Sequence, residues 1–305
     1  MIGLFCEPQF EGTRGLTRKS TSTAAPLKIL TQVRHGSAEL PPTARRIATF
    51  IAKNAGDVIR MSITELAEHT DASEGSVVAF CRRVGATGFQ DLKILLARDL
   101  VDPVQLIHED LKPGHTVDQV GERVFAAHAA SLAETLKLMS SKSLARAVDA
   151  LCTAGRIETY GIGSAAPIAE DLAYRLMQLG YASKAVTDSH IQAVSAAMTS
   201  AEVTTVTISH SGSTIETILA TRLAHERGAK TIGITRLGKS PLSRHCDILL
   251  HTVANETKYR PEAMSSRVAQ LAIIDTLVSC CALSSPEKSI ENLQRTAKIL
   301  SEKRY

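Results

Sequence analysis

The sequence contains no tryptophan, and aromatic residues of all kinds make up only 4% of the chain. A folded core must therefore be filled by Ala, Leu, Ile and Val, the residues that parallel strands and their covering helices prefer. Apolar residues at 44% and charged residues at 22% are close to the averages of soluble globular proteins. This composition excludes a wholly disordered, collagen-like or coiled-coil chain.

Long apolar runs and metal-ligand spacings are also lacking. The richest apolar stretch, 268–283, is interrupted by polar residues such as Gln270 and Asp275, so we expect no membrane span. The apolar start, Met1 to Phe5, has neither the basic segment nor the long hydrophobic region of a secretory signal. The six cysteines form no Cys-x-x-Cys motif, which predicts reduced thiols in a cytoplasmic protein and no metal site.

Length and charge favour two domains, of which the first is slightly basic. The 305 residues are twice the about 150 that serve as a prior for one domain. Residues 1–100 carry 13 basic and 10 acidic side chains, whereas the remaining residues carry 22 and 21. This mild asymmetry permits a polyanion-binding first third without requiring one.

Three consecutive helices are predicted after Pro42. The first carries Ile47, Phe50 and Ile51 on one stripe and should end at 54–56. The second begins at Ser62, with Glu65 three residues later as the partner of a capping box. The third begins at Ser73, with apolar residues Val77, Phe80, Cys81 and Val84, and should be closed by Gly85.

This arrangement is typical of a helix-turn-helix unit, whose last helix lies in the DNA major groove. Hydroxyls and free N–H groups at the start of that helix suit phosphates and base edges, and arginines at its end suit phosphates. A plain three-helix bundle is the alternative that the pattern leaves open. The candidate DNA-contacting residues are Ser62, Ser73, Glu74, Gly75, Ser76, Arg82 and Arg83.

From Arg156 onward, short β-rich runs alternate with helical stretches. The strands are expected at 157–161, 185–187, 203–209, 231–235 and 248–252, and the helices between them at 167–180, 190–198 and 214–227. Strands separated by helices of this length pair in parallel through right-handed crossovers. We therefore predict an α/β fold class: an all-α helical domain followed by a doubly wound parallel-sheet domain.

Two turns in this second half carry candidate ligand contacts. Gly161, Gly163 and Ser164 follow the first expected strand, and the segment Ser209-His210-Ser211-Gly212-Ser213-Thr214 follows the third. In parallel sheets, ligands bind where strands end and helices begin. Hydroxyls, backbone N–H groups and a helix N-terminus together suit an anion such as phosphate, although a capped helix start would use the same residues.

A dinucleotide site and an enzyme active site are two other functions against which this pattern can be compared. The first turn reads G-x-G-x-x-A, and Asp188 stands 25 residues after Gly163, so a dinucleotide site is one alternative. The titratable residues near the expected cleft form no acid–base pair by spacing, and Ser211 lacks a nucleophile-elbow frame, which argues against an enzyme. These titratable residues are Asp188, His190, His210, Glu216, Glu256 and Glu262.

Longer segments resemble a known family. The segment 42–100, with SITELAEHT and SEGSVVAFCRRVGATGFQDLK, resembles the helix-turn-helix domain of RpiR-type bacterial transcription regulators. The segment 144–282, with YGIGSAAPIAEDLAYRL, ISHSGSTIET and SSRVAQLAIIDTLV, resembles the sugar isomerase (SIS) domain. The order of the two is that of the regulators. The predicted organisation is a disordered tail (1–25), a helix-turn-helix domain (26–102), a linker with connecting helices (103–140) and a SIS domain (141–305).

The resemblance implies a cytoplasmic regulator of carbohydrate metabolism that binds operator DNA as a homodimer or homotetramer and senses a phosphorylated sugar, without a cofactor. The family's S-x-S-G-x-T phosphate turn falls on Ser209, Ser211, Gly212 and Thr214, with His210 at its variable position. Its first ligand loop falls on Gly161, Gly163 and Ser164. A sugar-phosphate isomerase on the same scaffold is the alternative function.

The sequence departs from the family at both candidate sites. Ala165 stands where the family often has a serine, and Gly75, Ser76 and Ala79 replace usual residues of the recognition helix. Operator preference can therefore not be transferred from relatives. We expect the sugar phosphate to bridge the two turns and to act on the DNA-binding heads through the helices within 116–154.

Overall fold

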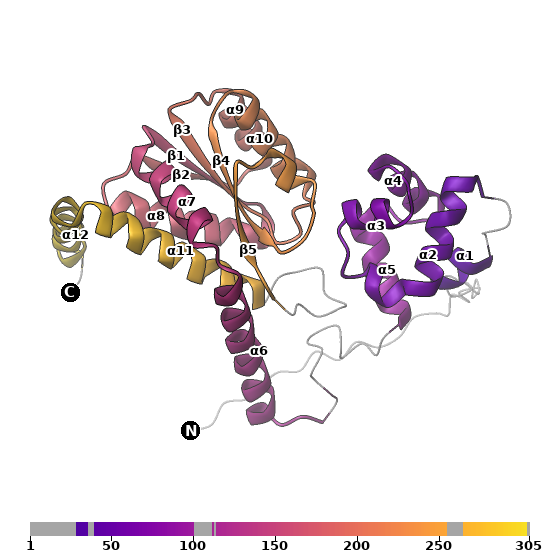
Figure 1. Ribbon diagram of the computed structural model, residues 1–305. Helices are drawn as coiled ribbons and strands as arrows, with labels where there is room; N and C mark the ends of the chain where they lie inside the picture. Colours follow the sequence, from indigo (N-terminus) through magenta and orange to yellow (C-terminus); the bar gives the residue numbers. More distant parts are fainter. Residues whose placement is uncertain (1–28, 36–39, 101–111, 113, 255–264, 304–305) are drawn as a thin grey trace, which may run out of the picture.

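The computed structural model describes residues 29–35, 40–100, 112, 114–254 and 265–303. The predicted tail, Cys6, the first part of the predicted linker (103–111 and 113), Glu256 and Glu262 lie outside these residues. Figure 1 shows a helical unit, α1–α5 in indigo and purple, beside an α/β unit that contains the sheet, with helix α6 projecting from the latter.

The helical unit is built from five helices around one apolar core. Its centre is formed by Ile47, Ile51, Leu66, Phe80 and Leu92, all of them buried. The predicted starts at Ser62 and Ser73 are confirmed, because both residues cap the helices that follow them. The helices are α1 (Ile29–His35), α2 (Pro42–Val58), α3 (Ile63–His69), α4 (Glu74–Arg83) and α5 (Phe89–Leu100).

Helix α2 runs further than the sequence pattern indicated. It was expected to end at 54–56, but it continues to Val58 across a kink at Asn54, whose φ and ψ are −125° and 31°. The Asn54 side-chain amide donates to the carbonyl of Phe50 at 3.0 Å, which is the local competition with the helix that such residues offer. The helix resumes because Ala55 and Val58 still face the core.

The α/β unit contains a five-stranded sheet in the order β2-β1-β3-β4-β5, with every neighbouring pair parallel. The predicted strands and intervening helices are confirmed, each end to within two residues. The strands are β1 (Arg156–Tyr160), β2 (Ser183–Val186), β3 (Val203–Ile208), β4 (Lys230–Arg236) and β5 (Ile248–Thr252). The helices are α7 (Ser141–Thr153), α8 (Ala166–Gln178), α9 (Ser189–Ala197), α10 (Ile215–Glu226), α11 (Ser265–Ser284) and α12 (Pro286–Ser301), with short 3₁₀ helices η3 (Gly163–Ala165) and η4 (Leu242–His245).

Helices cover both faces of the sheet. Helices α7, α8 and α11 pack on one face, and α9 and α10 on the other. Helix α11 is the one helix of the described residues whose length and composition would suit a membrane span. Its residues Ile273, Ile274 and Leu277 are buried in the core instead, which explains its apolar composition.

Helix α6 (Val117–Leu138) connects the two units and begins with a capping box between Thr116 and Gln119. Its carboxyl-terminal half is attached to the α/β unit, where the Thr135 hydroxyl donates to the carbonyl of Val253 at 3.2 Å. Phe125 and Leu136 of this helix are 79% and 70% exposed, so these two apolar side chains are covered by little of the described chain.

Candidate functional site

The helix-turn-helix geometry is fixed by local hydrogen bonds. The Ser62 hydroxyl accepts from the N–H of Glu65 at 3.1 Å, and the Glu65 carboxylate accepts from the N–H of Ser62 at 2.6 Å. The turn to α4 passes through Asp71, whose φ is +46°. The Arg46 guanidinium donates to the carbonyls of Thr70 and Asp71 and so holds this turn against α2.

Helix α4 presents polar groups at its start and arginines at its end. Ser73 caps it by accepting from the N–H of Ser76 at 3.1 Å, and the two hydroxyls lie 2.9 Å apart. Arg82 and Arg83 are exposed in the last turn, and neither is paired with another side chain of the described chain. Such free guanidinium groups suit phosphate contacts.

The first turn of α4 faces the α/β unit. Glu65 pairs with Arg236 at 2.6 Å, Glu68 with Lys239 at 2.9 Å and Glu74 with Arg244 at 2.8 Å. Three acidic side chains of α3 and α4 thus meet three basic side chains of the segment 236–244, which we call the basic segment. In Figure 1, α3 and α4 lie on the side of the helical unit that faces α10.

Two predicted DNA contacts are occupied by this interface. The Ser62 hydroxyl donates to the carbonyl of Lys239, and Ser62 is buried. Glu74 accepts from the Thr64 hydroxyl at 2.6 Å in addition to its pair with Arg244. In this conformation, Ser62 and Glu74 bond to the α/β unit, whereas Ser73 and Ser76 bond to each other and Arg83 is exposed.

Glu65 is the most strongly held acid of the interface. Burial opposes ionisation of its carboxyl, but the hydrogen bond from the Ser62 N–H and the charge of Arg236 outweigh that effect and lower the pKa. The fit around it is close, because a Cβ on Gly238 would come within 2.6 Å of a Glu65 carboxylate oxygen. The Glu65–Arg236 pair is therefore charged at neutral pH, and it is the least exposed of the three pairs.

The first predicted ligand turn follows β1. Gly161 is required there, because a Cβ would approach the carbonyl oxygen of Ala165 to 2.6 Å. The N–H groups of Ala165 and Ala166 already bond within η3, and Pro167 has no N–H. This turn therefore offers a ligand the exposed Ser164 hydroxyl and few backbone donors.

The second predicted turn, Ser209–Thr214, follows β3 and is termed the hydroxyl turn. Gly212 has φ +59°, and a Cβ there would collide with the Ser240 side chain. The Ser211 hydroxyl accepts from the N–H of Ser213 at 3.2 Å, but Thr214 does not cap α10 with its side chain. The first-turn N–H groups of α10, at Ile215, Glu216 and Thr217, find no acceptor among the described residues.

The two turns lie at the same edge of the sheet, because β1 and β3 are neighbouring parallel strands with Tyr160 paired to Thr207. Ser209 is buried at the end of β3, with its N–H bonded to the carbonyl of Ile234. The carbonyl of His210 accepts from the N–H of Arg236, so this residue ties the hydroxyl turn to the start of the basic segment.

The dinucleotide alternative does not fit the observed role of Asp188. Its carboxylate caps α9 by accepting from the N–H groups of His190 and Ile191, each at 2.9 Å. The acid that would hold a ribose is therefore committed to a helix start.

A cavity of about 850 Å³ lies between the two units, within the range of roughly 300–1,000 Å³ that is typical of ligand pockets. We call it the inter-unit cavity. Its lining combines Ser211, Ser213 and Thr214 of the hydroxyl turn with Gly75 and Arg82 of α4. The other predicted ligand residues, including Ser164 and Ser209, do not line it.

Basic side chains that the sequence reasoning missed also line the cavity. These are Arg222 of α10 and His245 of η4. Burial, with the nearby charge of Arg222, lowers the pKa of His245, so its ring is neutral at pH 7 and can accept or donate a hydrogen bond. The signal that could have found this region is the run of basic residues from Arg236 to Arg244, which has no acidic residue within it.

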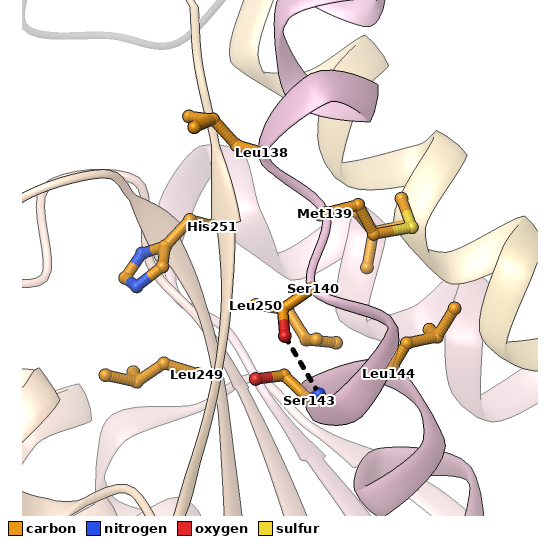
Figure 2. Close-up of a pocket in the computed structure, with 9 residues that line it drawn as sticks. Leu138, Met139, Ser140, Ser143, Leu144, Leu249, Leu250 and His251 are labelled. Atoms are coloured by element: carbon orange, nitrogen blue, oxygen red, sulfur yellow. Dashed lines mark hydrogen bonds between the residues drawn. The ribbon is translucent and has the colours of Figure 1, made fainter.

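A second, smaller cavity lies where α6 joins α7, beside β5 (Figure 2). Its volume of about 170 Å³ is below the usual range for ligands, and its lining is mostly apolar. The Ser140 hydroxyl in it caps α7 by accepting from the N–H of Ser143 at 3.3 Å, as the dashed line in Figure 2 shows. This cavity has the features of a packing gap rather than of an anion site.

Comparison with known proteins gives a consistent picture. The model of the helix-turn-helix domain of the rpiR family matches residues 27–103, and that of the SIS domain matches residues 150–280. A regulator of Caldanaerobacter subterraneus, described as an uncharacterized HTH-type transcriptional regulator, is 32% identical over 90% of this chain and 97% of its own length. One of Thermotoga maritima with the same description is 31% identical over 92% and 100%.

Among solved structures, the chain is similar to the Vibrio vulnificus NanR protein complexed with ManNAc-6P. The two are 31% identical, with a TM-score of 0.78 over 90% of this chain and 99% of the other. At this coverage the likeness includes both the helical unit and the α/β unit.

Proposed function

The chain belongs to the RpiR family of helix-turn-helix transcriptional regulators, and we propose that it regulates genes of carbohydrate metabolism in response to a phosphorylated sugar. As a member of this family it is a DNA-binding transcriptional regulator with a SIS domain. The site residues and the response to the ligand are the parts of the proposal that experiments must test.

For operator DNA, the proposed contacts are the start and the end of α4. The hydroxyls of Ser73 and Ser76 suit phosphates or base edges, and Arg82 and Arg83 suit phosphates. Gly75 permits close approach of the backbone. Ser62 and Glu74 become available to DNA only when the helical unit leaves the basic segment, since both are engaged there.

For the sugar phosphate, the observation that carries the proposal is the uncapped start of α10 at the edge of the inter-unit cavity. Three N–H groups without acceptors, the hydroxyls of Ser211 and Thr214 and the positive end of the helix dipole together form an anion site. Ser164 is the proposed contribution of the neighbouring turn. The similarity to NanR, whose structure holds ManNAc-6P, supports amino-sugar phosphates as the first compounds to test.

The remaining features of the proposal concern assembly and chemistry. The exposed apolar residues of α6, among them Phe125 and Leu136, support a subunit contact in a homodimer or homotetramer. A cytoplasmic location fits a regulator that binds genomic DNA. The rival function, a sugar-phosphate isomerase, would leave the helix-turn-helix without a role, and we propose no catalysis.

A ligand screen and an operator titration test the proposal. Hexose 6-phosphates, pentose 5-phosphates and N-acetylamino-sugar 6-phosphates are compared by thermal unfolding of the full chain, because a ligand of the folded state raises its midpoint. The strongest hit is then added to an operator selected from genomic fragments, and DNA binding is followed by fluorescence anisotropy. We expect a change in operator affinity of about 5- to 150-fold.

The variant Ser211→Ala distinguishes a loss of sugar-phosphate binding from a loss of folding stability. Because the Ser211 side chain is partly exposed, its loss should change unfolding by no more than about 0.5 kcal/mol while weakening sugar-phosphate binding about tenfold. An operator affinity that ignores every compound in the panel would contradict the proposed function.

A further inference from the structure

We propose that Arg82 of the recognition helix forms part of the sugar-phosphate site, so that the sugar phosphate and the operator compete for the same side chain. This inference rests on the proposed function, and it extends that function by naming a ligand contact outside the SIS domain. It also assigns the direction of the response: the sugar phosphate releases the operator.

The first argument is the shape of the inter-unit cavity. One wall is the hydroxyl turn with Ser211 and Thr214, and the opposite wall is α4 with Gly75, Val78 and Arg82. A sugar phosphate seated with its phosphate on the start of α10 therefore extends toward α4. The helical unit closes a site that the α/β unit alone would leave open to solvent.

The second argument is charge. The acidic residues of the cavity are engaged: Glu74 pairs with Arg244, and Asp91 accepts from the N–H of Thr87 at 2.7 Å. Arg82 has no ion-pair or hydrogen-bond partner in the described chain, and Arg222 forms a long ion pair with Glu226, at 3.8 Å. Arg82 and Arg222 therefore offer guanidinium donors to the phosphate of a bound sugar phosphate.

The third argument is that helix α4, which carries Arg82, is held against the α/β unit at its start. The pairs Glu65–Arg236, Glu68–Lys239 and Glu74–Arg244 attach α3 and the first turn of α4 to the basic segment. Arg82 follows Glu74 by about two helical turns on the same helix, so these pairs fix the position of the backbone from which its side chain extends into the cavity lining. Arg83, one residue later, does not line the cavity.

The direction of the response follows from mutual exclusion. In this closed arrangement, Ser62, Glu74 and Gly75 face the α/β unit, so the first turn of α4 is not free to enter a major groove. A sugar phosphate that contacts both walls binds the closed state more tightly than the open one and shifts the population toward it. Operator DNA binds the open state and shifts it back.

The test compares Arg82→Ala with Arg83→Ala in the full chain without DNA. Binding of N-acetylmannosamine 6-phosphate, glucose 6-phosphate and inorganic phosphate is measured by calorimetry for both variants and the wild type. The probe that binds the wild type most tightly should bind Arg82→Ala about 10- to 100-fold more weakly and Arg83→Ala within about twofold of the wild type. Equal thermal midpoints of the unliganded variants verify that both are folded.

A second measurement uses the fact that, if the sugar phosphate weakens operator binding, the operator must weaken sugar-phosphate binding by the same factor. A saturating operator duplex should raise the apparent dissociation constant of the same probe by about 5- to 150-fold in the wild type. If Arg82→Ala binds the probe as the wild type does while Ser211→Ala does not, the inference is wrong and the proposed function stands. If Ser211→Ala also binds it normally, or no probe binds the wild type, the proposed function fails as well.

Discussion

Two hydroxyl-rich helix starts in this chain look alike in sequence and differ in structure. Ser73 at the start of α4 bonds the N–H of Ser76 and so caps its own helix. Thr214 at the start of α10 makes no such bond, and the first-turn N–H groups of α10 are left without acceptors in the described chain. The same residue types thus stabilise one helix and prepare the other for an external anion.

Helix α9 extends the comparison within the sheet. It also follows a parallel strand, yet Asp188 caps it through two N–H groups. Helix α8, after β1, also lacks a side-chain cap, but the N–H groups of Ala165 and Ala166 before it bond within the turn. The uncapped start that borders the inter-unit cavity is that of α10.

The largest effect is expected from Gly212→Ala, which distorts the hydroxyl turn. A Cβ at φ +59° is strained and collides with Ser240, so we predict a loss of about 2 kcal/mol or more in the free energy of unfolding and no measurable response to sugar phosphates. The control is Gly163→Ala, which has a similar φ of +62° but no neighbour within 4 Å. Denaturant unfolding of both variants measures the difference, and equal losses would contradict the close fit at Gly212.

The next effect concerns the contact between the two units. Arg236→Glu places like charges opposite Glu65, which should open the inter-unit contact and tighten operator binding about fivefold without any sugar phosphate. The double variant Glu65→Arg/Arg236→Glu restores opposite charges and should return operator affinity toward the wild-type value. Anisotropy titrations at one salt concentration measure this, and a double variant no different from Arg236→Glu alone would contradict a specific pair.

The smallest effect on sugar-phosphate binding is expected at the capped start. Ser73→Ala removes the bond to the Ser76 N–H and should cost about 1 kcal/mol in the free energy of unfolding. Because Ser73 does not line the inter-unit cavity, sugar-phosphate affinity should remain within about twofold of the wild type. A large loss of sugar-phosphate affinity with unchanged stability would reverse the distinction between the two starts.

Local signals in the sequence were sufficient for much of the fold. The capping box of Ser62 and Glu65 and the alternation of β-rich and helical runs depend on neighbours along the chain, and the structure confirms them. The prediction that α2 ends near Asn54 was wrong. Asparagine often ends a helix, but here it only bends the helix, because Ala55 and Val58 continue the apolar stripe.

The candidate site was accessible to sequence reasoning only in part. Hydroxyls at strand ends suggest an anion, but whether a hydroxyl caps its own helix depends on geometry. The pairs between α3 or α4 and the basic segment join residues about 170 positions apart, as with Glu65 and Arg236. No local pattern predicts contacts between residues so far apart in the sequence. Only the tertiary structure shows that Arg82, Arg222 and His245 line the inter-unit cavity.

The most direct test of the account is hydrogen exchange of two helix starts, with and without the sugar phosphate that most stabilises the chain. Peptides that cover the first turn of α10 are compared with peptides that cover the first turn of α9, which Asp188 already caps. The account predicts that the sugar phosphate slows exchange at Ile215–Thr217 and leaves His190 and Ile191 unchanged. Unaltered exchange at the start of α10, despite saturating ligand, would contradict it.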